Sequence, residues 1–144
     1  MPDSIRDLVH AYALSRDPQF FAPQATIEQM PIGRVVRGRT AIGAMFRSFY
    51  LEAFSNGDEH IRGIAVDDTR RIGVVESIFR GRHAREVLGI PLSGSRIEVP
   101  IIGIYEFEAD QIARGRVYFD VATLLGRFRA DTLPASEEGE RGRG

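Results

Sequence analysis

The segment RVYFDVATLL, from Arg116 to Leu125, places a carboxylate at the junction of two elements. Its residues alternate as in a strand as far as Phe119, after which the apolar residues follow helical spacing. Asp120 lies at the change. An aspartate here either caps the helix, by accepting hydrogen bonds from its first backbone N–H groups, or acts as a general acid or base at the end of a sheet. The sequence leaves both interpretations open, and they predict different burial and a different pKa.

Two further polar side chains could take part in chemistry at the same sheet. Tyr118 shares a strand face with Asp120, since side chains alternate along a strand, and its hydroxyl could donate to a substrate carbonyl. It could equally pack as a core tyrosine with its hydroxyl at the rim. Glu76 interrupts the apolar run IGVVESIF and therefore needs solvent or a partner. A pocket position and an arginine-paired structural position both meet that need.

Composition removes several other kinds of chemistry. The chain has no Cys, and its His residues stand far apart at 10, 60 and 83, so we expect no thiol nucleophile and no metal site. All 19 basic residues are Arg, scattered among 20 acidic residues, which predicts no nucleic-acid partner. No run approaches the roughly 18 apolar residues of a membrane span, and the N-terminus carries charges throughout. These patterns predict no membrane partner and a cytoplasmic location.

Helical spacing predicts two helices in the first half of the chain. The first covers residues 4–17 behind a cap at Asp3 or Ser4, and the second begins at Thr40, its candidate N-cap, in TAIGAMFRSFYLEAFS. A short strand is predicted at Ala25–Pro31. The glycine-bounded segment GRVVRGR that follows is expected to be a linker.

The second half predicts a meander of strands. A turn at residues 56–58 precedes them, a loop is expected at residues 90–96, and EADQ is short enough for a hairpin. The predicted strands cover residues 60–68, 71–83, 96–108 and 111–120. Runs of helices followed by runs of strands favour one α+β domain, residues 1–130, with a disordered tail at 131–144.

Three segments of the chain resemble the SnoaL-like polyketide cyclases of the NTF2-like superfamily. They are RGRTAIGAMFRSF, FRGRHAREVLGIPLSGSRIEVPIIGIYEFE and QIARGRVYFDVATLLGRF, which span most of residues 34–128 in the order and spacing of that family. The resemblance implies an NTF2-like cone, in which a strongly curved, mostly antiparallel sheet wraps around the N-terminal helices and encloses an apolar pocket.

The same resemblance implies a function. The family position that matches Asp120 is the general acid/base for ring closure, and burial in the pocket would raise the pKa of this carboxyl group. The implied activity is that of a cyclase, isomerase or lyase, without a cofactor, on a hydrophobic carbonyl-containing small molecule. Tyr118, Glu76, His83 and Tyr12 are the expected substrate-binding residues. A non-catalytic small-molecule-binding module of the same fold is the alternative.

Two related activities fit the residues less well. The chain resembles ketosteroid isomerases at LVHAYAL, where Tyr12 matches their helix-borne tyrosine, and at ATIEQMPIG, but Gln29 stands where their base is an aspartate. Limonene-type epoxide hydrolases need an arginine flanked by two aspartates, and Val74 stands where the arginine would be required.

A homodimer is also expected. The family resemblance suggests it, and apolar residues stand on both faces of the strand from Ile97 to Phe107. One of those faces can pack on the helices, so the other requires a cover.

Overall fold

The computed structural model describes residues 4–86 and 93–122. The predicted tail at 131–144 lies outside these residues. The helices are α1 (Ile5–Ser15) and α2 (Arg39–Phe46), the latter continued by a π-helix (Arg47–Ala53), with 3₁₀ turns at Pro18–Phe20 and Met30–Ile32. The strands are β1 (Phe21–Gln29), β2 (Arg34–Arg37), β3 (Phe54–Asp67), β4 (Ile72–His83), β5 (Arg96–Glu108) and β6 (Gln111–Phe119).

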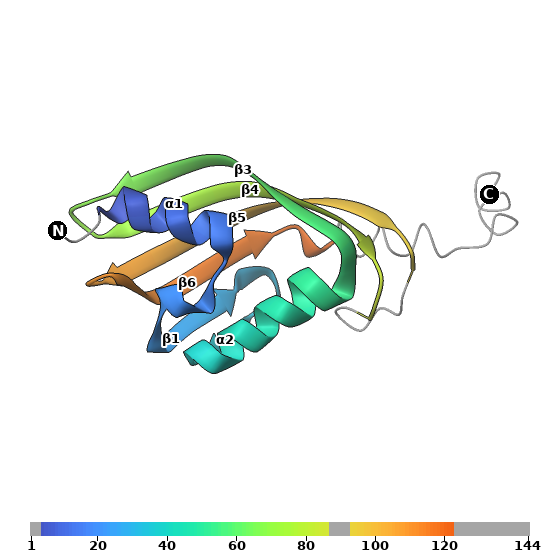
Figure 1. The fold of residues 1–144 in the computed structure, drawn as a ribbon, viewed down its shortest axis with the longest axis horizontal. Coiled ribbons are helices and arrows are strands. Elements are labelled where there is room, and N and C mark those ends of the chain that lie inside the picture. The colour runs from blue at the N-terminus through green and yellow to red at the C-terminus, as the bar shows by residue number, and fades with distance from the viewer. Residues whose placement is uncertain (1–3, 87–92, 123–144) are drawn as a thin grey trace, which may run out of the picture.

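The strands form one curved six-stranded sheet in the order β2-β1-β6-β5-β4-β3. Every neighbouring pair is antiparallel except β1 and β6, which run parallel. Both helices lie on the same face of the sheet, which curves around them (Figure 1). This arrangement confirms the predicted α+β cone with a mostly antiparallel sheet.

The first helix forms as its sequence predicts. Ser4 is the N-cap, and its hydroxyl accepts a hydrogen bond from the backbone N–H of Asp7 at 3.1 Å. Arg16 ends the helix in the left-handed conformation with φ of 51°. The buried stripe of α1 consists of Ile5, Leu8, Val9, Tyr12 and Ala13. Burial of this stripe fixes the helix on β3 and β4.

The start of the second helix corrects two predictions. The expected linker contains the strand β2, which pairs with β1, and the helix begins at Arg39 with Gly38 as its N-cap. Gly38 has φ of 91°, a conformation that suits glycine, and Thr40 lies within the helix. Pairing with β2 satisfies the backbone groups of β1, and local turn signals do not reveal such a requirement.

The predicted turn at residues 56–58 is also wrong, since these residues lie inside β3. The pairing of β3 with β4 shifts register between Ser55 and Asp58, and Asn56 adopts φ of 54°. The residue types that favour a turn also favour a β-bulge, because both need a left-handed backbone that Asn tolerates well.

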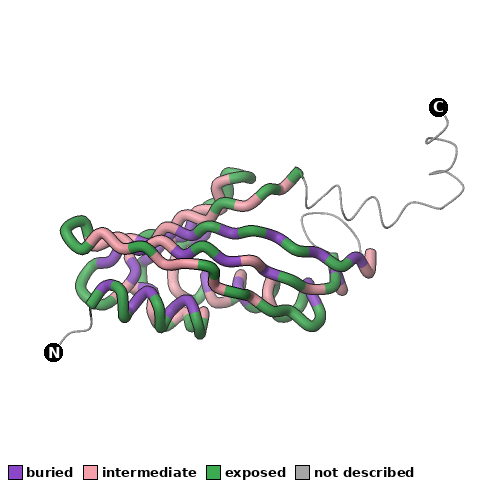
Figure 2. Tube along the Cα trace, turned by 90° about the horizontal axis from the view of Figure 1, so that it is seen from above, coloured by how far each residue is buried: buried purple, intermediate pink, exposed green. Residues whose placement is uncertain are grey.

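Burial alternates along the central strands, as Figure 2 shows. On β5 the side chains that face the helices are buried, whereas the other face carries the exposed residues Glu98, Pro100 and Ile102. The core therefore lies between the sheet and the helices, and among the described residues no α-helix or strand packs on the outer face of the sheet.

Candidate functional site

A small cavity lies between the inner face of the sheet and the two helices. It has a volume of about 40 Å³, which leaves room for water but not for a typical organic ligand, because such ligands occupy sites of about 300–1,000 Å³. The residues that line it are Tyr12, Arg16, Ile27, Gln29, Met45, Phe46, Phe49, Tyr50, Val99, Ile101, Tyr105, Val117 and Phe119. A bound ligand must therefore displace part of this apolar wall, where Met45 is the most adaptable side chain.

Two polar atoms on the cavity wall lack a hydrogen-bond partner. The hydroxyl of Tyr12 and the carboxamide oxygen of Gln29 are both buried and unpaired among the described residues. Burial, together with the neighbouring Tyr105, raises the pKa of the Tyr12 hydroxyl well above its usual value of 10.0, although the nearby Arg16 guanidinium opposes the effect. Tyr12 therefore keeps its proton at neutral pH and can donate a hydrogen bond to a ligand.

Arg16 connects α1 to the sheet at the edge of the cavity. Its Nε and Nη2 atoms donate to the two oxygens of Glu59 at 3.0 and 2.8 Å, and its Nη1 donates to the Tyr105 hydroxyl at 3.1 Å. Ser77 donates to the same carboxylate at 2.7 Å. The two-point pairing of Arg16 with Glu59 is largely buried, so it fixes the direction of the guanidinium group and of Tyr105.

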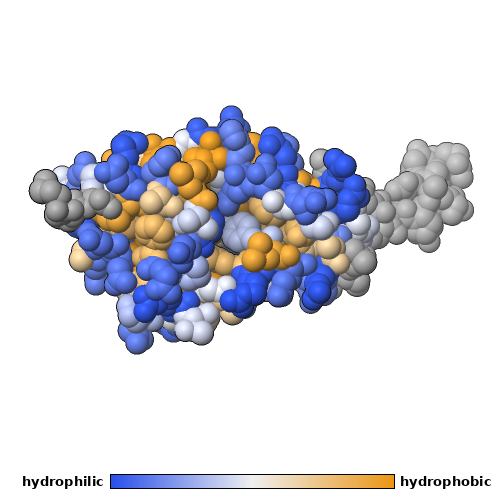
Figure 3. Space-filling view, in the orientation of Figure 1, coloured by the Kyte–Doolittle hydropathy of each residue, from blue (hydrophilic) through white to orange (hydrophobic). Residues whose placement is uncertain are grey.

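A surface cleft adjoins the cavity on the side of the helices. It has a volume of about 510 Å³ and shares Arg16, Phe46 and Tyr50 with the cavity wall. Leu14 and Leu51 on its rim are 68% and 74% exposed. In Figure 3, hydrophobic atoms reach the surface in the gap between the two helices. Tyr50 belongs to the π-helix, a conformation that often occurs at functional sites.

Three of the residues singled out from the sequence meet on the other face of the sheet. Asp120, Tyr118 and Glu76 line an open pocket of about 560 Å³ together with Pro100 and Ile102. Ile102 pairs with Glu76 on one side and Tyr118 on the other, so the three side chains share the outer face. Asp120 is exposed.

The expected position of Asp120 inside the cavity therefore needs correction. Tyr118 does lie beside it, but both face away from α2. Phe119 lines both the inner cavity and the outer pocket. Strand alternation explains the difference, since Val117 and Phe119 face the cavity and Tyr118 faces outward.

His83 lines neither the inner cavity nor the outer pocket. It is buried at the end of β4, where its Nδ1 forms a 2.8 Å hydrogen bond with the hydroxyl of Ser93. Ser93 in turn donates to Ser95 at 2.8 Å. Burial lowers the pKa of His83 below its usual value of 6.5, although the backbone at Arg85 and the charge of Glu86 oppose the effect.

Sequence reasoning missed several residues of the cavity. Arg16 and Glu59 are 43 positions apart, so no local pattern joins them. From the sequence, Gln29 at the end of the first strand could reach the mouth of the cone, but it cannot act as a base and is not among the expected site residues. Tyr50 and Tyr105 stand in apolar stretches that predict ordinary core positions, and only the folded chain brings both side chains to the cavity wall.

Within residues 4–86 and 93–122, no group of three or more His, Cys, Asp or Glu side chains could hold a metal ion. In the same residues, no helix is long and apolar enough to cross a membrane.

Solved structures with the same fold come from several bacteria. A proposed SnoaL-like polyketide cyclase from Shewanella denitrificans aligns with a TM-score of 0.73 at 15% identity, over 88% of this chain and 97% of that one. TsrD from Streptomyces laurentii aligns with a TM-score of 0.70 at 22% identity, over 90% and 93%. A protein of ketosteroid isomerase-like fold from Catenulispora acidiphila aligns with a TM-score of 0.62 at 18% identity, over 94% and 98%.

At the level of sequence, no curated protein matches the chain. Residues 3–127, however, match the family described as SnoaL-like polyketide cyclase. That range contains every described strand and both helices, including the cavity and the outer pocket. The chain therefore belongs to the SnoaL-like polyketide cyclase family.

Proposed function

We propose that the chain acts as a cyclase or isomerase on a hydrophobic, carbonyl-containing small molecule that it binds in the inner cavity. The observation that carries the proposal is the pair of buried polar atoms on the apolar wall, the Tyr12 hydroxyl and the Gln29 carboxamide oxygen. A buried polar group without a partner is costly, and a ligand that pairs with it recovers this free energy.

A ligand that satisfies both atoms must carry one hydrogen-bond acceptor and one hydrogen-bond donor. The Tyr12 hydroxyl donates a hydrogen bond to a carbonyl oxygen, and the Gln29 carboxamide oxygen accepts a hydrogen bond from a hydroxyl group. The enol form of a β-dicarbonyl compound carries both groups close together. Hydrogen bonding to the carbonyl oxygen would also stabilise the negative charge that develops there when the neighbouring carbon loses a proton.

The proton acceptor that we propose is Asp120, although it lies on the outer face. Phe119, the preceding residue, lines both the inner cavity and the outer pocket, so a ligand that displaces its ring would come close to the Asp120 carboxylate. The neighbouring Tyr118 and Glu76 would then contact the same ligand from the outer pocket.

The experiment uses benzoylacetone, an aryl β-diketone whose enol form absorbs in the ultraviolet. Calorimetry measures its affinity, and absorbance measures the rate of keto–enol conversion. We expect Tyr12→Phe to weaken binding about tenfold, since the hydrogen bond to the carbonyl oxygen of the ligand is lost. Asp120→Asn should preserve affinity and slow conversion about a hundredfold. Equal affinity of wild type and Tyr12→Phe would contradict the proposed binding site.

A non-catalytic binding module is the second candidate. One observation favours it: no carboxylate lines the cavity within the part of the chain that the structure describes. In that case benzoylacetone would bind with the same dependence on Tyr12, while the protein would leave the rate of conversion unchanged. Asp120→Asn would then have no effect on either measurement.

A further inference from the structure

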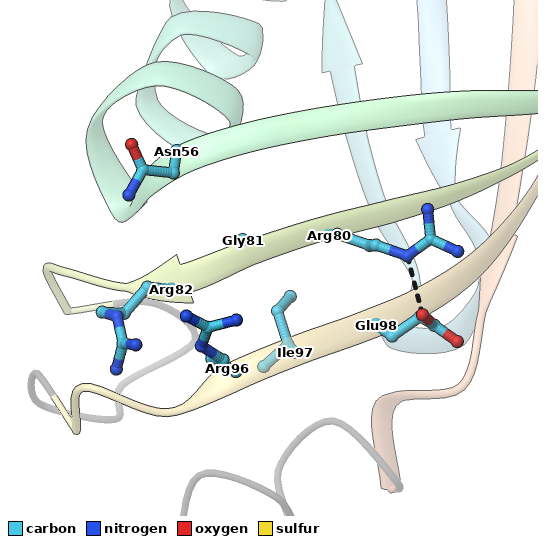
Figure 4. Close-up of a pocket in the computed structure, with 7 residues that line it drawn as sticks. All are labelled: Asn56, Arg80, Gly81, Arg82, Arg96, Ile97 and Glu98. Atoms are coloured by element: carbon cyan, nitrogen blue, oxygen red, sulfur yellow. Dashed lines mark hydrogen bonds and ion pairs between the residues drawn. The ribbon is translucent and has the colours of Figure 1, made fainter.

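A further hollow opens at the far end of the sheet, where β4 ends and β5 begins. It has a volume of about 320 Å³ and shares no lining residue with the cavity. Figure 4 shows the residues that line it: Asn56, Arg80, Gly81, Arg82, Arg96, Ile97 and Glu98. Three of the seven carry a positive charge and one carries a negative charge.

The strand register places acidic residues opposite Arg80 but not opposite Arg82 or Arg96. Arg80 has an acidic partner on each neighbouring strand, Asp58 on β3 and Glu98 on β5. Its Nε donates to Glu98 at 2.7 Å, as the dashed line in Figure 4 marks. The charge of Arg80 is therefore balanced within the sheet.

Arg82 is placed differently. Its register partners are Ser55 on β3 and Arg96 on β5, so two arginines stand directly opposite each other on the same face of the sheet. Like charges in this arrangement destabilise a strand pair. Arg82 donates to the backbone oxygen of Gly94 at 2.7 Å, whereas Arg96 makes no hydrogen bond or ion pair with any described residue.

We propose that Arg82 and Arg96 form a binding site for the phosphate group of a small molecule. Guanidinium groups bind phosphate through two parallel hydrogen bonds, and an anion between them converts their repulsion into attraction. Two facing arginines match a group with several oxygens and more than one negative charge, which favours phosphate over a single carboxylate. The hollow exceeds the volume of a bare phosphate and leaves space for an organic part beside Asn56 and Ile97.

The test measures binding of inorganic phosphate to the full chain. Side-chain N–H signals of the arginines are followed by NMR, and Tm is compared in phosphate, acetate and chloride at equal ionic strength. We expect phosphate to shift the signals of Arg82 and Arg96 and to raise Tm more than the other anions do. Arg96→Gln should weaken phosphate binding about tenfold, because it removes a charged hydrogen-bond donor.

A charge reversal makes the test sharper. Arg96→Glu places an acid opposite Arg82, so in phosphate-free buffer Tm should rise by about 2–4 °C, while the specific response to phosphate disappears. The control is Arg62→Glu, an equal charge change at an exposed position of β3 outside this hollow. Phosphate also stabilises proteins in general, and the control retains that effect. The proposal is overturned if Arg96→Glu responds to phosphate as the control does, or if phosphate and acetate act equally on the wild type.

Discussion

At the scale of single residues, the cavity wall carries two buried polar atoms that have no hydrogen-bond partner among the described residues, the Tyr12 hydroxyl and the Gln29 oxygen. A buried tyrosine normally pairs its hydroxyl, yet Tyr12 contacts aromatic rings on several sides, with the Tyr105 ring centroid at 4.9 Å and that of Phe21 at 5.5 Å. Its ring stabilises the core, and we propose that its hydroxyl binds a ligand. The two contributions can be separated by mutation.

Tyr12→Phe should leave the free energy of unfolding unchanged or raise it by up to about 1 kcal/mol, because it removes a buried hydroxyl that makes no hydrogen bond with any described residue. The matched variant Tyr105→Phe loses the bond from Arg16 and should lower the free energy of unfolding by about 1 kcal/mol. Urea denaturation measures both. If Tyr12→Phe is the less stable of the two, its hydroxyl has a partner in solution.

His83 should make stability depend on pH. Its pKa is lower in the folded chain than the usual 6.5, so the folded state favours the neutral ring. This contribution is fully present above about pH 6.5, the pKa of an unfolded histidine, and is lost as the pH falls through the folded pKa. Urea denaturation is compared at about pH 7.5 and about pH 5, which lie on either side of the pKa of an unfolded histidine. The wild type should lose more stability between these values than His83→Gln does. Parallel curves would count against a shifted His83.

At the scale of elements, two glycines let β5 and β6 hold Tyr105 flat against the sheet. A Cβ at Gly103 would overlap the Tyr105 ring and hydroxyl, and one at Gly115 would lie 3.2 Å from the same ring. The bare backbone on these neighbouring strands lets the hydroxyl reach Arg16. At these two positions, glycine allows a side chain to approach the backbone closely.

Gly103→Ala should therefore displace Tyr105, break its bond with Arg16 and cost about 1–3 kcal/mol of stability. Gly63→Ala on β3 is the control, since its added methyl group would meet only the Glu76 carboxylate at 4.0 Å. The free energy of unfolding of each variant is measured in urea. Similar values for the two would show that Tyr105 moves aside without cost.

At the scale of the whole molecule, the outer face of the sheet has no α-helix or strand packed on it within the part of the chain that the structure describes. Ile102 and Tyr118 are 43% and 39% exposed on this face, although both lie on central strands. Large apolar side chains in the middle of a sheet usually pack against something. A second copy of the chain remains our expectation for this cover.

We expect the protein to sediment as a dimer at micromolar concentration and Ile102→Arg to sediment as a monomer. An arginine at this position would place an unpaired charge in the centre of the interface. Leu14→Arg on the helix side is the control, since Leu14 is exposed far from the outer face, and it should remain dimeric. A wild-type monomer, or dissociation of both variants, would contradict this interface.

The sequence by itself determined the elements and the family. Helical and strand periodicity located α1 and the strands β4 to β6 to within a few residues, since burial on one face imposes these periods directly. It failed at Arg34–Arg37 and at Asn56, where pairing with the neighbouring strand, β1 for Arg34–Arg37 and β4 for Asn56, decided the backbone conformation. Local residue preferences carry no information about such partners.

Only the tertiary structure decided which polar groups meet. Alternation along β6 correctly grouped Tyr118 with Asp120, but it cannot say which face of a strand the helices cover. The curvature of the sheet and the position of α1 brought Tyr12, Arg16 and Gln29 to one cavity, although they come from a helix, its C-cap and a strand. Contacts between such distant segments depend on packing of the whole chain, and spacing in the sequence does not encode them.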